Sequence, residues 1–160
     1  MTKEKLTGLE TGGIFEFHEE YFEPVTIENR KIKTIDFSVA HFYKPVTFDK
    51  CTIDKFILFG TTFVEGLQIS NCTIAEKFLF QSDGYNKNNF SIKIENTLFR
   101  CLADFEDCYF IGEVHIENVK FIKGSNLLGN KNTPVEVGFE QGIIIKNVEG
   151  DLKINSLYNT

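Results

Sequence analysis

Residues 46–65 read VTFDK CTIDK FILFG TTFVE, four consecutive units of five residues that share one pattern. Each unit has a large apolar residue at its centre and a smaller or apolar residue two positions before it. Apolar residues that alternate in this way are typical of a β-strand, and each unit is too short to bury a face on its own. The stretch therefore predicts short strands that need neighbouring copies to form a core.

The same alternation recurs along the chain at intervals of about 21 residues. Further copies begin at Val25, Leu67, Ile92, Ala103, Val114 and Ile143, and related runs begin at Ile35, Phe56 and Phe78. If successive turns of the chain stack about 4.8 Å apart, each backbone group can pair with the coils above and below it. The inward side chains then form one continuous core. No long stretch carries the spacing of an amphipathic helix. We therefore predict an all-β fold, a solenoid with about 21 residues per coil and four short sides.

Several residues are predicted to stack in structural columns. Cys51 and Cys72 occur in the same tripeptide, Cys-Thr-Ile, and we interpret both as small buried residues facing one column of the core. A disulfide or a metal site is the alternative. Phe56 and Phe78 begin equivalent runs and are expected at the centre of the core.

A turn residue follows most copies, and it is usually an asparagine. Asparagine tolerates left-handed backbone geometry, and stacked asparagines can form a hydrogen-bonded ladder. A row that binds sugar or metal is the alternative. The residues at this position are Asn29, Asn71, Asn96, Asn118 and Asn147, with Asp107 and Lys50 as exceptions.

Composition excludes several classes of protein. The 160 residues suit one domain, and the content of 42% hydrophobic and 25% charged residues predicts a folded chain, with 17 Phe and no Trp. The net charge of −6 removes the usual electrostatic basis for direct nucleic-acid binding. No apolar run is long enough to span a bilayer, and no apolar stretch follows Met1–Leu6. We expect a cytoplasmic protein that does not contact membranes.

The chain is predicted to contain a cap, a solenoid and two insertions. Residues 1–24 depart from the repeat and are assigned to an N-terminal cap, acidic outside and Phe-rich inside. Residues 25–160 form the β-helix domain. Residues 81–89 and 124–134 lack the alternation and are interpreted as projecting loops.

Functional contacts in solenoids often lie on such insertions. We therefore name Tyr85, Leu127 and Leu128 as exposed candidates for binding a partner. The alternative is that both insertions are merely tolerated.

Residues able to carry chemistry are few. His18 is followed by two glutamates without metal-ligand spacing, His41 lies in a turn-like stretch, and His115 is expected to point outward. Large β-helices can be polysaccharide lyases or hydrolases with paired carboxylates on an outer face, and Asp104 and Glu106 are expected to project from one outer side. An exposed charge on a strand is usually only solvated. We predict no catalytic residue, no cofactor and no metal, and hence no enzyme.

The four units in residues 46–65 resemble the pentapeptide-repeat family. The resemblance covers residues 35–80 best and residues 97–123 more loosely, although bulkier Phe, Ile and Val replace the family's usual small residues. It implies a right-handed quadrilateral β-helix. Some members of that family resemble duplex DNA in shape and charge and bind type II topoisomerases. The filament-forming bactofilins are a more distant resemblance.

Three functions follow as hypotheses. The first is a non-enzymatic binding or scaffold module that presents a rigid surface to a protein partner. The second is a DNA mimic that binds a type II topoisomerase, which the outward acids allow and the intermingled lysines oppose. The third is a self-assembling structural protein. Because residues 142–145 and 151–154 still resemble strands, we also expect a homodimer through the C-terminal coil.

Overall fold

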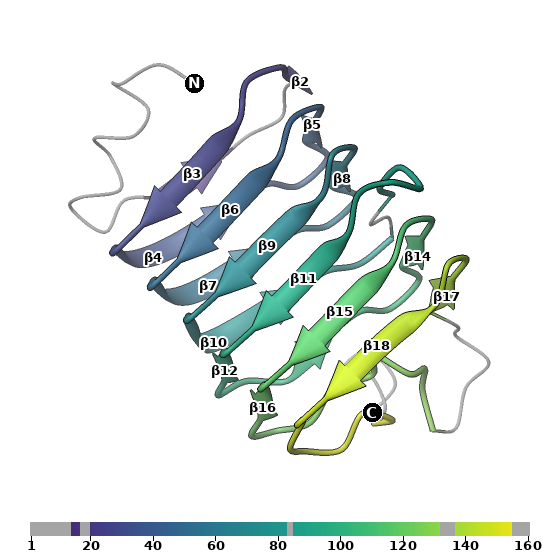
Figure 1. Ribbon diagram of the computed structural model, residues 1–160. Helices are drawn as coiled ribbons and strands as arrows, with labels where there is room; N and C mark the ends of the chain where they lie inside the picture. The colour runs from purple at the N-terminus through teal and green to yellow at the C-terminus, as the bar shows by residue number, and fades with distance from the viewer. Residues whose placement is uncertain (1–13, 17–19, 83–84, 132–136, 155–160) are drawn as a thin grey trace.

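A computed structural model describes residues 14–16, 20–82, 85–131 and 137–154 of the protein. Throughout these residues the chain forms short strands and turns and no helix. The strands pair in parallel and stack as a β-solenoid of about five turns, with about 22 residues per turn (Figure 1). The all-β solenoid is confirmed, whereas its right-handed sense and its N-terminal cap stay predictions.

The pairing register fixes which positions are equivalent in successive coils. The first paired positions are Val25, Val46, Leu67, Ile92, Val114 and Ile143, and we number coils one to six from them. The steps between them are 21, 21, 25, 22 and 29 residues. The longer third and fifth steps contain residues 81–89 and 124–134, where the sequence predicts insertions.

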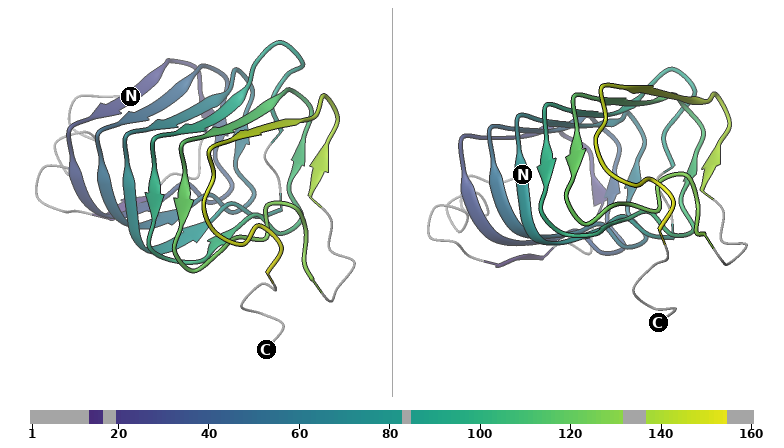
Figure 2. Two further views of the ribbon diagram at one scale, coloured as in Figure 1. Left: turned by 60° about the horizontal axis from the view of Figure 1, so that its bottom comes forward. Right: turned by 90° about the horizontal axis from the view of Figure 1, so that it is seen from below.

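Four parallel sheets run along the solenoid (Figures 1 and 2). The first contains β3 (Val25–Glu28), β6 (Val46–Asp49), β9 (Leu67–Ser70), β11 (Ile92–Glu95), β15 (Val114–Glu117) and β18 (Ile143–Lys146). The second contains β1 (Ile14–Glu16), β4 (Lys31–Asp36), β7 (Thr52–Ile57), β10 (Thr73–Leu79), β12 (Leu98–Phe99), β13 (Ala103–Asp104) and β16 (Lys120–Phe121). The third contains β2 (Glu20–Tyr21), β5 (His41–Phe42) and β8 (Thr62–Phe63), and the fourth contains β14 (Tyr109–Phe110) and β17 (Gly138–Phe139).

Phenylalanine fills the core. Alternation turns every second side chain of a strand inward, so one strand contributes one or two core residues. Phe56 and Phe78 are fully buried, as predicted, and their rings lie edge to face with centroids 5.8 Å apart. The other large side chains in the interior are Phe37, Phe42, Phe48, Phe63, Phe80, Phe99, Phe105, Phe110 and Phe121.

Asparagines turn the chain out of the first sheet. Asn29, Asn71, Asn96, Asn118 and Asn147 all have a positive φ between 49° and 54°, and Lys50 occupies the same corner. Asparagine adopts this conformation at lower cost than most residues because its short side chain bonds locally. The ladder expected from the sequence is present: Asn147 Nδ2 donates to Asn118 Oδ1 (3.1 Å), and Asn118 Nδ2 donates to Asn96 Oδ1 (3.2 Å).

Asp107 belongs to a different corner from the one predicted. It follows the β13 segment, and its corner also holds Val39, Gly60 and Ser82, all with φ between 58° and 61°. Backbone hydrogen bonds place these turns one above another, because the amide of Gly60 donates to Gln81 and that of Ser82 donates to Glu106. The repeat therefore has two left-handed corners.

Residues 125–128 are part of the stack, which corrects the prediction of a loop over 124–134. Ser125 forms a parallel bridge with Ala103, and its amide donates to Asp151 O at 2.7 Å. Ser125 points inward, and its Oγ donates to Ala103 O and accepts from the Leu127 amide, so a polar residue fits a core position. This serine hides the alternation, because Leu127 is the next inward residue.

The described part of residues 1–24 also extends the stack. β1 pairs with β4, and β2 pairs with β5. The expectation of a Phe-rich interior is wrong at Phe22, which is exposed because alternation turns the preceding Tyr21 inward. Phe22 instead stacks on the ring of Tyr43 with centroids 4.7 Å apart.

Candidate functional site

One side of the solenoid carries a row of outward aromatic and aliphatic side chains. It is formed by outward residues next to the inward residues of β2, β5, β8 and β14, and by Tyr85, which lies next to the inward Asn86 of coil three. We call it the aromatic face, and it consists of Phe22, Tyr43, Val64, Tyr85, Tyr109 and Ile111. Phe42, Phe63 and Phe110 fill the core behind it.

Two tyrosines of the aromatic face, Tyr43 and Tyr109, are held by neighbouring carboxylates. Tyr43 Oη donates to Glu20 Oε1 at 3.0 Å, and Tyr109 Oη donates to Glu140 Oε2 at 3.2 Å. Hydrogen bonding to a carboxylate raises the pKa of both phenols above their usual value. Both therefore stay neutral at physiological pH. The rings of Tyr85 and Tyr109 lie with centroids 6.0 Å apart, so the row continues from coil three to coil four.

A loop rises beside this row and encloses a hollow of about 450 Å³. It precedes β11 and stands above the neighbouring coils in both views of Figure 2. The hollow is mostly apolar, a property typical of sites for small ligands or anchoring side chains. Its lining residues are Thr62, Val64, Tyr85, Asn86, Lys87, Asn88, Asn89, Phe90 and Ile111.

Asn86 fixes this loop to the solenoid. Its side chain is buried at an inward position, where Nδ2 donates to Phe90 O (2.6 Å) and Oδ1 accepts from the Gly112 amide (3.1 Å). A Cβ on Gly112 would lie 2.1 Å from Phe90 O and 2.6 Å from Asn86 Nδ2, so only glycine allows this approach. The Phe63 amide donates to Tyr85 O, and the Lys87 amide donates to Val64 O. The hollow is therefore built before any partner arrives.

Phe90 also borders a second hollow of about 210 Å³. Asn89 and Phe90 line both hollows, so the loop forms a ridge between them. Lys44, near the second hollow, donates to Glu65 Oε1 at 2.9 Å. The second hollow is more polar and smaller, and it is lined by Pro45, Val46, Thr47, Glu65, Gly66, Leu67, Gln68, Asn89, Phe90, Ser91 and Lys93.

Of the three residues predicted to bind a partner, the structure places one on this site. Tyr85 is 47% exposed and lines the larger hollow. Leu128 is exposed, but it lies in coil five, where its amide donates to Leu152 O, and it lines neither hollow. Leu127 is fully buried, so its prediction as an exposed residue is wrong.

Sequence reasoning missed Tyr43, Tyr109 and Phe90. The signal for the two tyrosines was present, because each lies next to an inward phenylalanine in a short alternating strand. Phe90 gave no such signal, since it follows a polar stretch without alternation.

Residues considered for chemistry do not converge on a site. His41 lies in β5, not in a turn, and His115 points outward with Nε2 2.9 Å from Glu113 Oε2. His18 lies outside the described residues. Asp104 is buried, contrary to expectation, because Gln81 Nε2 and Asn126 Nδ2 donate to its carboxylate at 2.8 and 2.7 Å. Among the described residues no three His, Cys, Asp or Glu side chains form a group that could hold a metal ion.

An acidic column runs along the outside of the first sheet. The register aligns Glu28 with Asp49, and Glu95 with Glu117. Ser70 separates the two pairs and Lys146 ends the column. Asn71 Nδ2 donates to Asp49 Oδ1 at 2.7 Å, and this bond lowers the pKa of Asp49. The column is therefore short and interrupted.

Comparisons with known proteins found no relative. The sequence matches no protein-family model, no curated protein and no solved structure. In the part of the chain that is described, no helix could cross a membrane.

Proposed function

We propose that the protein is a non-enzymatic binding module that presents the aromatic face to a protein partner. The observation that carries this proposal is a row of outward aromatic side chains beside a rigid apolar hollow of about 450 Å³. Tyrosine is enriched among the residues that dominate binding energy at protein interfaces, because it buries a large area with few rotatable bonds.

The arrangement also indicates how a partner would bind. The hollow between Tyr85, Val64 and Ile111 suits one apolar side chain of the partner as an anchor. Tyr109 and Tyr43 would flank that anchor, with their hydroxyls already bonded to carboxylates. Because the loop is fixed by Asn86, little ordering entropy would be lost on binding. We expect the partner to be a cytoplasmic protein.

The test is an affinity capture from a lysate of the organism that makes the protein, with quantitative mass spectrometry. Three baits are compared. The first is the wild-type protein, and the second carries Tyr85→Ala and Tyr109→Ala together. The third is a control that carries Thr26→Ala, which changes an exposed side chain on β3. A partner that binds the aromatic face should lose about tenfold or more of its enrichment with the double variant. It should be retained by the control. Equal capture by all three baits would overturn the proposal.

Self-association is the second candidate, and one observation favours it. Ile143 and Ile145 of β18 are only half-buried, whereas the equivalent Val114 and Ile116 of β15 are fully buried. β18 also ends its sheet, so its outer edge has no further strand among the described residues. A homodimer would cover both. A monomeric mass by light scattering at tens of micromolar would exclude it.

The DNA-mimic hypothesis has one supporting feature, the acidic column of the first sheet. Mimicry of duplex DNA needs rows of negative charge, whereas this column has four acids, an interrupting serine and a terminal lysine. Enrichment of a topoisomerase subunit by the wild-type bait, lost on Glu95→Gln with Glu117→Gln, would promote this hypothesis over the first.

A further inference from the structure

Two cysteines lie directly opposite each other in neighbouring coils. The register aligns Asp49 with Ser70 and Thr52 with Thr73, so Cys51 of coil two faces Cys72 of coil three. Both are free thiols. Adjacent strands of a sheet lie about 4.8 Å apart, which falls within the Cα separation of about 4.4–6.8 Å that disulfides require. Their position between two strand pairs therefore satisfies the backbone condition for a cross-link.

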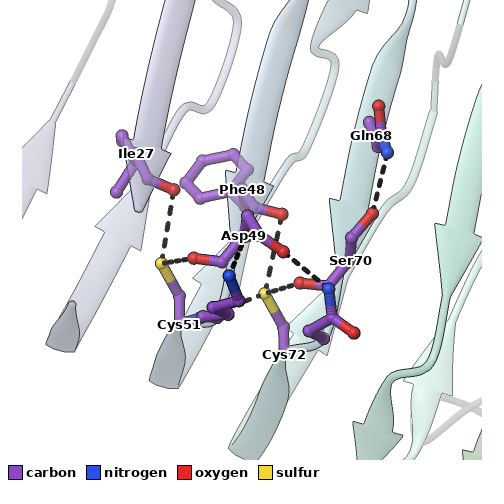
Figure 3. Close-up of polar contacts among 9 residues, drawn as sticks. Ile27, Phe48, Asp49, Cys51, Gln68, Ser70 and Cys72 are labelled. Atoms are coloured by element: carbon purple, nitrogen blue, oxygen red, sulfur yellow. Dashed lines mark hydrogen bonds and ion pairs between the residues drawn. The ribbon is translucent and has the colours of Figure 1, made fainter. Parts of the chain in front are cut away.

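The side chains of this pair are also close (Figure 3). Cys72 Sγ donates to Ser70 O at 3.1 Å, in its own coil, and lies 3.7 Å from Phe48 O and 3.4 Å from the Cys51 amide, which donates to it, so it also borders coil two. Cys51 Sγ donates to Asp49 O at 3.3 Å and to Ile27 O at 3.4 Å. Rotation of the Cys51 side chain away from Ile27 would bring its sulfur toward Cys72. This rotation breaks only the weak S–H···O hydrogen bonds of the Cys51 thiol.

The two thiols of the pair differ in acidity. The neighbouring Cys72 side chain lowers the pKa of Cys51 below its usual value. The neighbouring Cys51 side chain, together with burial, raises the pKa of Cys72. The thiolate is the reactive form of cysteine, so Cys51 would react first and Cys72 would follow. Neither of the other two cysteines shares this environment: burial raises the pKa of Cys101 to about 11, and Cys108 Sγ donates to Phe80 O.

We propose that Cys51 and Cys72 form a dithiol that hydrogen peroxide oxidises to a disulfide joining coils two and three. The Cys51 thiolate attacks one peroxide oxygen, the O–O bond breaks, and hydroxide leaves and takes up a proton to become water. Cys51 is then a sulfenic acid. The Cys72 sulfur attacks Cys51 Sγ, the S–S bond forms, and the S–O bond breaks to release a second water with the Cys72 proton. In total two thiols lose two electrons and one peroxide gains them.

Burial selects the oxidant. Cys51 and Cys72 are only 2% and 3% exposed, so a small neutral peroxide can reach them where a bulky disulfide such as oxidised glutathione cannot. The product would close a loop of about 21 residues and fasten the two coils that support the loop ridge. Oxidation would thus cross-link the corner that follows β6 and β9, at the opposite end of these strands from the aromatic face.

The experiment uses a variant with Cys101→Ser and Cys108→Ser, which leaves only the pair. The folded variant is treated with hydrogen peroxide, the remaining thiols are alkylated, and the mass is measured. We expect a loss of about 2 Da, no alkylation, a peptide linking residues 51 and 72, and a Tm about 6–12 °C higher. Dithiothreitol should reverse all four. Oxidised glutathione at the same concentration should react far more slowly.

The matched control adds Cys51→Ser and should show neither the mass loss nor the rise in Tm. If the double serine variant does not fold, peptide mapping of the peroxide-treated wild-type chain gives the same answer. The proposal is overturned if both thiols stay alkylatable under peroxide conditions that oxidise free cysteine. It is also overturned if sulfinic acid forms at either position without the linked peptide.

Discussion

Replacing Phe78 by alanine should lower the free energy of unfolding more than replacing any exposed aromatic residue, because the Phe78 ring packs against three other rings in the core. Its side chain is 1% exposed, and its ring lies between those of Phe56 (5.8 Å), Phe99 (5.0 Å) and Phe105 (5.4 Å). Removing a buried Phe costs about 3–5 kcal/mol in total, and the contacts with three neighbouring rings place Phe78 in the upper part of that range. The surrounding rings belong to the coils on either side, coil two and coil four, and cannot collapse into the cavity. We therefore expect a loss of about 4–5 kcal/mol.

Urea unfolding followed by far-ultraviolet circular dichroism measures this loss. The matched control is Phe59→Ala, which removes the same ring from a side chain that is 45% exposed and should cost less than about 1 kcal/mol. Phe78→Leu, which keeps most of the volume, should cost about 1–2 kcal/mol and serves if the alanine variant does not fold. A loss below about 2 kcal/mol for Phe78→Ala, or one equal to that of Phe59→Ala, would refute the stacked core.

Three further predictions follow from particular positions. Val39→Asn should raise the free energy of unfolding by about 0.5–1 kcal/mol. Val39 is exposed and has φ 61°, a conformation that is strained for a β-branched residue and less so for asparagine. An unchanged or lower Tm contradicts this prediction. Leu127→Ala should lower the free energy of unfolding by about 2–5 kcal/mol, because Leu127 is fully buried. Leu128→Ala should lower it by less than about 1 kcal/mol, because Leu128 is 38% exposed. Chemical denaturation measures both, and equal losses argue against residue 127 as a core position. The hydrogen bond from Asn71 lowers the pKa of Asp49 in the folded protein below its usual value of 3.8. The ionised Asp49 therefore stabilises the folded state above pH 3.8, and this stabilisation is lost as the pH falls through the folded-state pKa. Asp49→Asn should flatten the fall in Tm between pH 5 and pH 2; parallel curves for wild type and Asp49→Asn contradict the assignment.

The architecture could be predicted because its cause is local. Strand alternation in residues 46–65 and asparagines at the turns each act over a few residues, and stacking then repeats them. Cys51, Cys72, Phe56 and Phe78 are buried where the pattern predicts. Asp107 was assigned to the wrong corner because both corners need a left-handed residue, and composition alone does not distinguish them.

The failures occur where a contact between coils overrides the local pattern. Ser125 fills a core position because its hydroxyl donates to Ala103 O and accepts from the Leu127 amide. A serine does not continue the apolar alternation, so the sequence did not identify Leu127 as a core residue. Asp104 occupies an outward position by alternation, yet Gln81 and Asn126 from the coils on either side bury it. The larger hollow could not be predicted either, because its walls come from coils two, three and four.

Site-specific photo-crosslinking would show whether a partner contacts the aromatic face, as we propose. A photoreactive amino acid replaces Tyr109 in one version of the protein and Thr26, on the first sheet, in another. After irradiation in cells of the source organism, we predict one crosslinked protein with the probe at position 109 and none with the probe at position 26. Crosslinking only from position 26, or equal products from both positions, would show that the aromatic face is not the binding surface.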